Sequence, residues 1–421
     1  MQSSIKLRLT VMNFLQFAVW GAYLTSMGRY LGTAGFGSEI GNFYAMQGLV
    51  SLFMPALMGI VADRWIPAQR LLGVCHMLAG MLMLGVFNYT QTDAPSYPTL
   101  FALYSLSVAF YMPTLALSNS VAYTSLDQAG LDLVKSFPPI RVFGTVGFIC
   151  TMIAVSLLGL EATSGQFAVS AIISLVLAVY AQTLPNCPTA PKGQSKSLVE
   201  ALGLRAFVLF KQRKMALFFI FSMLLGVSLQ ITNGFANPFI STFGEIPAYA
   251  DTFGVKYANI LISLSQLSET LCILLIPFAL RRFGIRRVML IAMVAWVLRF
   301  ALLGLGNPGS GVWLFLLSMI VYGVAFDFFN VSGSLFVDKE TDPSIRSSAQ
   351  GLFMIMTNGI GATLGSLGAQ AVVNHFVHTE HDTTAILAGW SMSWYVFAGY
   401  AAVVAVLFAL LFRYNTATEA K

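Results

Sequence analysis

The sequence predicts an all-helical membrane protein, and three observations carry that prediction. Of its 421 residues, 57% are hydrophobic and only 10% are charged, whereas soluble domains carry about 25% charged residues. The chain holds twelve apolar stretches, each long enough, at about 20 residues, to cross about 30 Å of hydrocarbon as a helix. Its 23 lysines and arginines are concentrated in alternate loops between these stretches.

The twelve predicted spans follow one another with short polar turns between most of them. The first is apolar to about Met27 and has no small-residue cleavage site, so we interpret it as a span and not as a removed signal peptide. In order, the spans cover residues 9–27, 40–62, 71–90, 98–122, 138–158, 165–184, 215–240, 258–280, 287–305, 312–337, 347–373 and 389–412.

The longest polar stretch, residues 185–214, separates the sixth span from the seventh. Its proline, lysine and serine content is typical of a linker, and the segment "SLVEALGLRAFVLF" within it indicates a short interfacial helix. We therefore expect two six-helix halves, residues 1–184 and residues 215–421, joined by this linker.

The basic residues predict the orientation of the chain. With the N-terminus placed in the cytoplasm, 19 of the 23 lysines and arginines fall in cytoplasmic loops. Only Arg29 and Lys256 fall outside, while Arg141 and Arg299 occupy helix positions. This asymmetry follows the positive-inside rule and predicts cytoplasmic termini. It also explains the net charge of +6, so no nucleic-acid partner is expected.

A basic turn occurs at the same place in each half. The first reads "GIVADRWIPAQRLL", residues 59–72, and the second reads "PFALRRFGIRRVML", residues 277–290, with Arg281 where an acid would stand. The first turn resembles the loop motif of the major facilitator superfamily, although any short cytoplasmic turn tends to be basic. The resemblance implies a substrate site near the midplane, between the halves. We expect Asp63 and Arg64 to act in gating.

Two acidic residues lie where water is scarce. Fifteen of the 17 acids can be placed in loops, tails or membrane edges, but Glu269 and Asp327 fall within spans. An intramembrane carboxylate is costly and usually faces a cavity or a partner. The alternative is an ion pair that only holds helices together. The density of other polar groups nearby favours a cavity.

These polar groups recur at helical spacing, three or four residues apart and therefore on one helix face. Carboxamides both donate and accept hydrogen bonds, and aromatic rings offer stacking faces. The mixture suits a flat, neutral ligand with hydroxyl groups, such as a base joined to a sugar, although for each amide alone an interhelical hydrogen bond is the alternative. The groups are Arg141 and Thr145 with Phe143 between them, Gln230 and Asn233, Gln266 and Glu269, and Tyr322 and Phe326 beside Asp327.

Longer stretches carry a specific resemblance. The chain resembles the bacterial nucleoside:proton symporter family of the major facilitator superfamily, from the first span to the last. The similar stretches include "FPPIRVFGTVGFI" (137–149), "SQLSET" (265–270) and "LSMIVYGVAFDFFNVSGSLFV" (317–337). The resemblance implies a multi-pass inner-membrane protein that takes up nucleosides, purine nucleosides including xanthosine among them, with the proton gradient. It also implies a monomer with no cofactor and no metal.

The resemblance further implies which residues bind the nucleoside, and they are the polar and aromatic residues singled out above. They are Arg141, Phe143, Thr145, Gln230, Asn233, Gln266, Glu269, Tyr322, Phe326 and Asp327. Asp327 and Glu269 are the candidates for the driving proton, because the proton affinity of a carboxyl differs between a dry and a wet site. We expect Arg299 to snorkel to the interface or to form a structural ion pair.

Two other classes of function are compared with this one. A porter for sugars or other small polar solutes, or a drug:proton antiporter, would keep the fold, although an antiporter would favour a more apolar cavity. An intramembrane enzyme is disfavoured, because HExxH, GxSxG and P-loop motifs are absent from the sequence. A metal site at His375, His378 and His381 is the weaker alternative to a polar extracytoplasmic loop.

Overall fold

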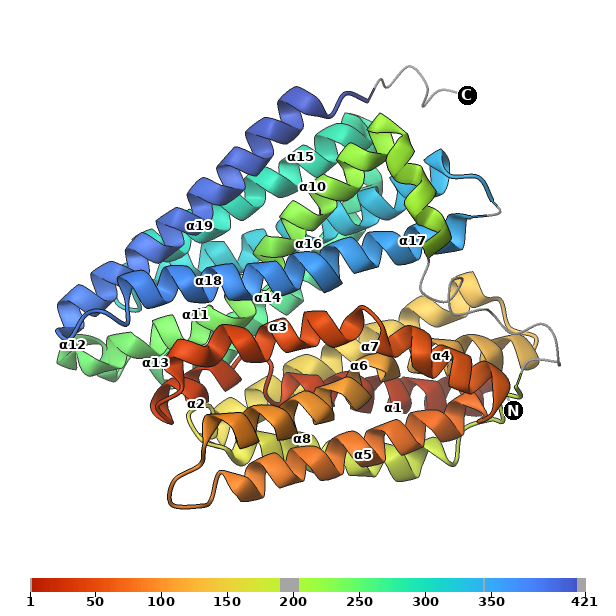
Figure 1. The fold of residues 1–421 in the computed structure, drawn as a ribbon, viewed down its shortest axis with the longest axis horizontal. Helices are drawn as coiled ribbons and strands as arrows, with labels where there is room; N and C mark the ends of the chain where they lie inside the picture. Colours follow the sequence, from red (N-terminus) through yellow and green to blue (C-terminus); the bar gives the residue numbers. More distant parts are fainter. Residues whose placement is uncertain (1, 190–203, 344, 415–421) are drawn as a thin grey trace. The chain divides into compact units, whose positions relative to one another are not determined.

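The computed structural model describes residues 2–189, 204–343 and 345–414, which form helices joined by turns and loops (Figure 1). No strand occurs in these ranges. Nine of the helices described there are long and apolar enough to cross a membrane. Residues 190–203 of the predicted linker, and with them the start of its predicted interfacial helix, lie outside the described residues, as does Lys421.

The chain divides into two compact units. One consists of Met1–Phe36 and Met46–Leu202, and the other of Gly37–Ala45 and Gly203–Lys421. The division runs through α3 (Ile40–Ser51), whose first residues belong to the second unit. There Gln370 accepts a hydrogen bond from the amide of Gly41 (2.6 Å) and donates one to the carbonyl of Gly37 (3.1 Å).

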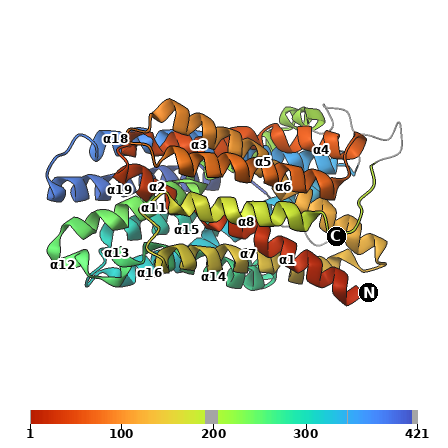
Figure 2. The same ribbon diagram turned by 90° about the horizontal axis from the view of Figure 1, so that it is seen from below.

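The first unit is built mainly from five long helices. Helix α5 packs against both α6 and α8, and α1 packs against α7 and α8 (Figures 1 and 2). The five long helices are α1 (Gln2–Gly21), α5 (Ala68–Tyr89), α6 (Tyr97–Gln128), α7 (Leu133–Leu157) and α8 (Gly165–Ala181). Two shorter helices, α2 (Met27–Thr33) and α4 (Met54–Arg64), belong to the same unit.

In the second unit, η2 (Leu204–Lys211) is a 3₁₀ helix in the second part of the predicted interfacial helix. Helix α15 packs between α16 and α19, α14 packs against α16, and α18 runs beside α19 (Figures 1 and 2). In order, the elements are η1 (Gly37–Glu39), α10 (Arg213–Leu229), α11 (Ile231–Thr242), η3 (Phe243–Glu245), α12 (Pro247–Ala250), α13 (Phe253–Lys256), α14 (Ala258–Cys272), η4 (Ile273–Leu275), α15 (Ile276–Leu305), α16 (Val312–Glu340), α17 (Arg346–Met354), η5 (Ile355–Gly361), α18 (Ala362–Phe376) and α19 (Thr383–Leu411).

Several predicted spans are not single regular helices. The span at 215–240 is interrupted at Gln230, where α10 ends and α11 begins. The span at 347–373 contains a π-helical turn, η5, a feature that is frequent at functional sites. The spans at 258–280 and 287–305 form one helical run, broken at Gly284 with φ 75° and ψ 163°. Only glycine readily adopts this conformation, so Gly284 makes the turn possible.

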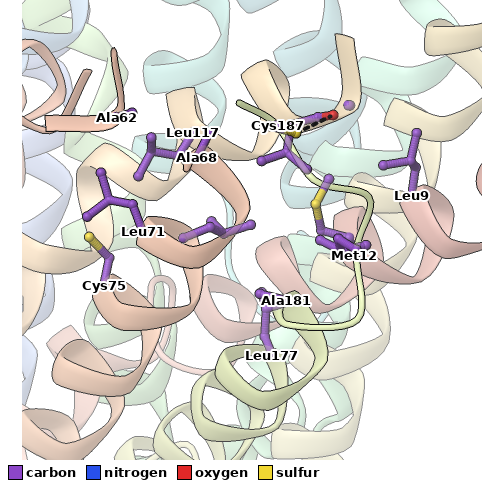
Figure 3. Packing of buried hydrophobic residues seen from close by; sticks show 14 of the residues in the cluster. Leu9, Met12, Ala62, Ala68, Leu71, Cys75, Leu117, Leu177, Ala181 and Cys187 are labelled. Atoms are coloured by element: carbon purple, nitrogen blue, oxygen red, sulfur yellow. Dashed lines mark hydrogen bonds between the residues drawn. The ribbon is translucent and has the colours of Figure 1, made fainter. Parts of the chain in front are cut away.

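One apolar core of the first unit joins six helices, α1, α4, α5, α6, α7 and α8. Figure 3 shows Leu9 and Met12 of α1, Leu71 of α5 and Leu177 of α8, which all belong to this cluster. Cys187 closes this core, and its thiol donates to the carbonyl of Val121 (3.9 Å). Burial raises the pKa of the Cys187 thiol, which keeps it protonated as a donor.

The first unit also buries a network of neutral hydrogen bonds. His76 of α5 lies 2.8 Å from Gln16 Oε1 of α1 and 3.0 Å from Ser174 Oγ of α8. Gln16 in turn donates to Thr114 of α6 (2.7 Å). Since polar groups in a membrane interior need partners, this network holds four helices in register.

Glycines allow α10 to contact η5 and α18 backbone to backbone. A Cβ atom added at Gly226 would lie 2.3 Å from the carbonyl oxygen of Thr357, and one at Gly361 would lie 2.4 Å from that of Met223. At Gly365 the added Cβ would lie 2.1 Å from the carbonyl oxygen of Val227. The segment "GIGATLGSLG", residues 359–368, thus supplies glycines for close helix packing.

We predict that Gly365→Ala destabilises the protein by about 1–3 kcal/mol, because the methyl group forces α10 and α18 apart. Gly368→Ala, three residues later on α18, meets no atom within 4 Å. It should be neutral or slightly stabilising through helix propensity. The measurement is the melting temperature of each purified variant in detergent, compared between Gly365→Ala and Gly368→Ala. Equal melting temperatures would show that the helices do not pack this closely.

Candidate functional site

Asp327 lies in the middle of α16 and is 5% exposed. Its Oδ2 atom is buried, and no residue in the described part of the chain gives it a hydrogen bond. A buried polar atom without a partner costs free energy, and such atoms are rare in native structures. The position is therefore prepared for a proton or for a ligand that supplies the missing hydrogen bond.

Glu269 lies on α14, which packs closely against the helix that carries Asp327. At the contact, a Cβ added at Gly323 would lie 2.5 Å from the carbonyl oxygen of Ser268, and the Ser268 hydroxyl donates to the carbonyl of Ile320. Glu269 is half-buried, and its charge interacts electrostatically with Asp327. Small residues at this contact thus allow close packing of the two helices that carry Glu269 and Asp327.

Aromatic rings lie next to the carboxylates on the same helix. Tyr322 and Phe326 are stacked, with their ring centroids 5.6 Å apart and their planes inclined by 10°. Trp296 of α15 meets the Tyr322 ring edge-on at 5.9 Å. Tyr322 is buried, whereas Phe326 is half-buried, so the stack offers a partly accessible ring surface one residue away from Asp327.

Arg299 is a fully buried cation behind this stack. It is 2% exposed, and its guanidinium carbon lies 4.5 Å from the centroid of the Tyr322 ring. Its Nη1 donates to the carbonyl of Ser318 (2.8 Å) and to the hydroxyl of Ser265 (3.3 Å). The expectation that Arg299 snorkels or forms an ion pair is wrong. It is held inside by neutral acceptors, and among the described residues no salt bridge includes it.

Gln230 and Asn233 contact each other where α10 gives way to α11. Asn233 Nδ2 donates to Gln230 Oε1 over 2.8 Å, as their three-residue spacing predicts. Gln230 is buried and Asn233 is half-buried. The pair keeps one amide NH₂ and one amide oxygen for other partners. Gln266, also half-buried, lies one turn before Glu269 on α14.

In the first unit, Arg141 of α7 stacks over the ring of Phe17 at 4.1 Å. Thr145 follows one helical turn later and is half-buried, like Arg141. Phe143 is 46% exposed, and two residues along a helix place it about 200° from Arg141. Arg141 and Thr145 therefore share a face of α7, whereas Phe143 lies on another. The substrate roles of all three residues stay predictions.

Two other sets of candidate residues lie at or just beyond helix ends. Asp63 and Arg64 are the last residues of α4, and Asp63 is half-buried. His375 lies at the end of α18, and His378 and His381 follow that helix. In the described ranges, no group of three or more histidines, cysteines and acids could hold a metal ion.

Sequence reasoning did not find the roles of Arg299 and Trp296. A charged residue inside an apolar span was enough to indicate that Arg299 has a role. Its contact with Tyr322 could not be predicted, because it depends on how α15 packs against α16. Trp296 gave no signal, because a tryptophan in an apolar helix is ordinary. Both side chains contact the ring of Tyr322, which the sequence did identify.

A family model described as "Nucleoside H+ symporter" matches residues 3–417. The chain belongs to the nucleoside H+ symporter family. Among curated members and relatives, the xanthosine permease of Escherichia coli K12 is 50% identical over 416 residues, covering 98% of this chain and 97% of that protein. The nucleoside permease NupG of the same organism is 46% identical over 415 residues, with the same coverage.

A solved structure agrees with this assignment of the symporter family. The crystal structure of the nucleoside transporter NupG matches the chain with a TM-score of 0.89 and 45% identity, over 98% of this chain and 100% of that one. The symporter fold is therefore that of a major facilitator-type transporter. Since these relatives are permeases and transporters, the chain is a membrane transporter and not an enzyme.

We predict that Asp327→Leu raises stability while abolishing function. Leucine has a similar branched shape and removes a buried oxygen that lacks a partner, which is worth about 1–3 kcal/mol. The apparent melting temperature in detergent should rise by about 3 °C or more.

The control for this prediction is Asp338→Leu, near the C-terminal end of α16, where the carboxylate is half exposed and pairs with Arg346 (3.2 Å). An exposed pair contributes little, so this change should alter the melting temperature by no more than about 1 °C. A lower melting temperature for Asp327→Leu would mean that the carboxyl is satisfied by the fold.

Proposed function

We propose that this transporter takes up nucleosides, purine nucleosides such as xanthosine among them, together with protons by alternating access. The observation that carries the proposal is the buried carboxyl of Asp327, whose Oδ2 has no hydrogen-bond partner among the described residues and which directly follows Phe326, one of the two stacked rings. A ring surface suits a flat base, and a carboxyl suits a proton or a sugar hydroxyl. The xanthosine permease and NupG bear names that agree with this chemistry.

The proposed substrate contacts divide by chemistry. The rings of Tyr322 and Phe326 stack on the base, because aromatic faces bind other flat rings. The amides of Gln230, Asn233 and Gln266 donate to and accept from base edges and ribose hydroxyls. Arg141, Phe143 and Thr145 of the first unit complete the proposed set, with the carboxyls of Glu269 and Asp327.

In the proposed coupling step, a proton binds to the Glu269–Asp327 pair in the state open to the outside. Two ionised carboxylates this close to each other repel, and a proton on either one relieves the repulsion. Protonation then permits the loaded site to occlude, because a neutral carboxyl is less costly to dehydrate than a charged one. Release of the proton to the cytoplasm restores the repulsion and resets the cycle.

The proposal also includes the arrangement in the membrane. Twelve spans form two six-helix halves, 1–184 and 215–421, around a cytoplasmic linker, with both termini in the cytoplasm. The distribution of the 23 lysines and arginines supports this orientation. Asp63 and Arg64 then lie at the cytoplasmic end of α4, where they can act in gating. We propose an inner-membrane location and a monomer as the working unit.

Uptake into proteoliposomes tests the proposal. Labelled xanthosine, uridine and adenosine are supplied with and without an inward proton gradient, to the wild type and to Asp327→Asn. We expect gradient-driven accumulation by the wild type and its loss in the variant, because the amide cannot take the proton. Uptake that ignores the gradient would make the protein a facilitator. Uptake of sugars but not of nucleosides would favour the porter alternative.

A second prediction concerns the amide pair. Asn233→Ala and Gln230→Ala should each weaken nucleoside binding about tenfold, since one lost hydrogen bond is worth about 1.4 kcal/mol. Equilibrium binding of labelled nucleoside to purified protein gives the affinity. Gln350→Ala is the control, because this amide bonds Ser334 (2.8 Å and 3.1 Å) and is not among the proposed contacts. Unchanged affinity in both test variants would remove the pair from the site.

A further inference from the structure

A cavity of about 560 Å³ lies in the second unit, between the beginning of α10 and the end of α19. Three of its seven lining residues are cations, and the other four are apolar. The two helix ends belong to the candidate membrane spans Arg213–Glu245 and Thr383–Leu411. Because the cavity adjoins the ends of these spans, it lies where the hydrocarbon core of a bilayer gives way to the headgroups. None of the proposed substrate contacts lines it.

The cations at this cavity outnumber the acids that pair with them. Lys214 forms a salt bridge with Glu340, the last residue of α16. Arg213 and Arg413 are both exposed, and neither takes part in a salt bridge between described residues. The described part of the cavity therefore presents two positive charges without an acidic partner. A phosphate group is a complementary ligand, since arginine can bind two phosphate oxygens through parallel hydrogen bonds.

Apolar side chains line the same cavity beside these cations. Leu410 is 63% exposed and Leu411 is 47% exposed, and both lie in the last turn of α19. A free phosphate or another small soluble anion gains nothing from two leucines. A phospholipid does, because its acyl chains lie in the hydrocarbon layer directly beside its phosphate. The combination of cations with exposed leucines thus fits a lipid better than a soluble anion.

The wall of the cavity at the end of α19 is anchored by several contacts. Phe412 is buried there, and its ring stacks on that of Phe408, with 4.7 Å between the ring centroids. Arg286 of α15 donates hydrogen bonds to the carbonyls of Phe412 (2.6 Å) and Ala409 (2.7 Å). Arg413 directly follows Phe412, so the backbone that carries this arginine is held at the cavity.

We propose that this cavity binds the headgroup of an anionic phospholipid, with Arg213 and Arg413 on the phosphate and with Leu410 and Leu411 against the acyl chains. A zwitterionic headgroup is a poorer ligand, because its ammonium group meets the same cations. In the proposed orientation this end of the unit faces the cytoplasmic leaflet, where basic pockets between membrane helices bind anionic headgroups. The inference does not depend on which solute the protein transports.

Titration of the purified protein with lipid in detergent, followed by native mass spectrometry, tests this proposal. The double variant Arg213→Gln with Arg413→Gln should bind phosphatidylglycerol at least about tenfold more weakly than the wild type, because two charge-assisted hydrogen bonds are lost. Arg213→Lys with Arg413→Lys should retain most of the affinity, since lysine binds phosphate as a point charge. The matched control is Arg70→Gln with Lys135→Gln, which removes two exposed cations of the first unit and should leave the affinity unchanged.

Three ligands distinguish a lipid site from other kinds of binding. Phosphatidylglycerol should bind to the wild type more tightly than phosphatidylethanolamine, and at least about tenfold more tightly than glycerol 3-phosphate, which has no acyl chains. Equal affinities for the two lipids would mean that lipid only coats apolar surface. Glycerol 3-phosphate that binds as tightly as phosphatidylglycerol would indicate a site for a soluble phosphate. Either result overturns the proposal, as do equal phosphatidylglycerol affinities in the glutamine double variant and the control.

Discussion

Three ionisable side chains, two of them buried and one half-buried, lie in an apolar helix bundle, and this is the constraint on which the second unit depends. Asp327, Glu269 and Arg299 lie on three adjacent helices, α16, α14 and α15. They avoid prohibitive cost because the helices approach closely at Gly323 and because backbone carbonyls and hydroxyls solvate the guanidinium. The close packing of α14 and α16, the stack of Tyr322 on Phe326 and the proposed proton site all accompany these charged groups in the interior of an apolar bundle.

The two units satisfy their buried polar groups in different ways. In the first unit, His76, Gln16, Thr114 and Ser174 form a network of neutral hydrogen bonds across four helices. In the second, Asp327 keeps an oxygen without a partner among the described residues, and Arg299 stacks on an aromatic ring instead of pairing with an acid. A satisfied network favours one arrangement, whereas an unsatisfied charge responds to protons and ligands. The second unit therefore holds the chemistry that we expect to change during transport.

The sequence predicted the features that depend on spacing along one helix. The contact of Gln230 with Asn233 and the stack of Tyr322 on Phe326 both follow from residues three or four apart, and Asp327 is conspicuous in an apolar span. Features that depend on which helices become neighbours were beyond it. The cation–π contact of Arg299 with Tyr322 joins different helices, and the helix break at Gln230 depends on the surrounding packing. Phe143 lies on another face of α7 than Arg141 and Thr145, and its contact with the substrate stays a prediction.

The contact of α10 with η5 and α18 has a mechanical consequence. Gly226, Gly361 and Gly365 bring backbone against backbone, so no side chain from these three positions interlocks with the opposite helix. Sliding between two helices is ordinarily limited by side chains that must leave one groove and enter the next. At these three glycines no methyl or larger side-chain group projects into the contact. The contact can bear a small shear at low friction while the helices remain in full van der Waals contact.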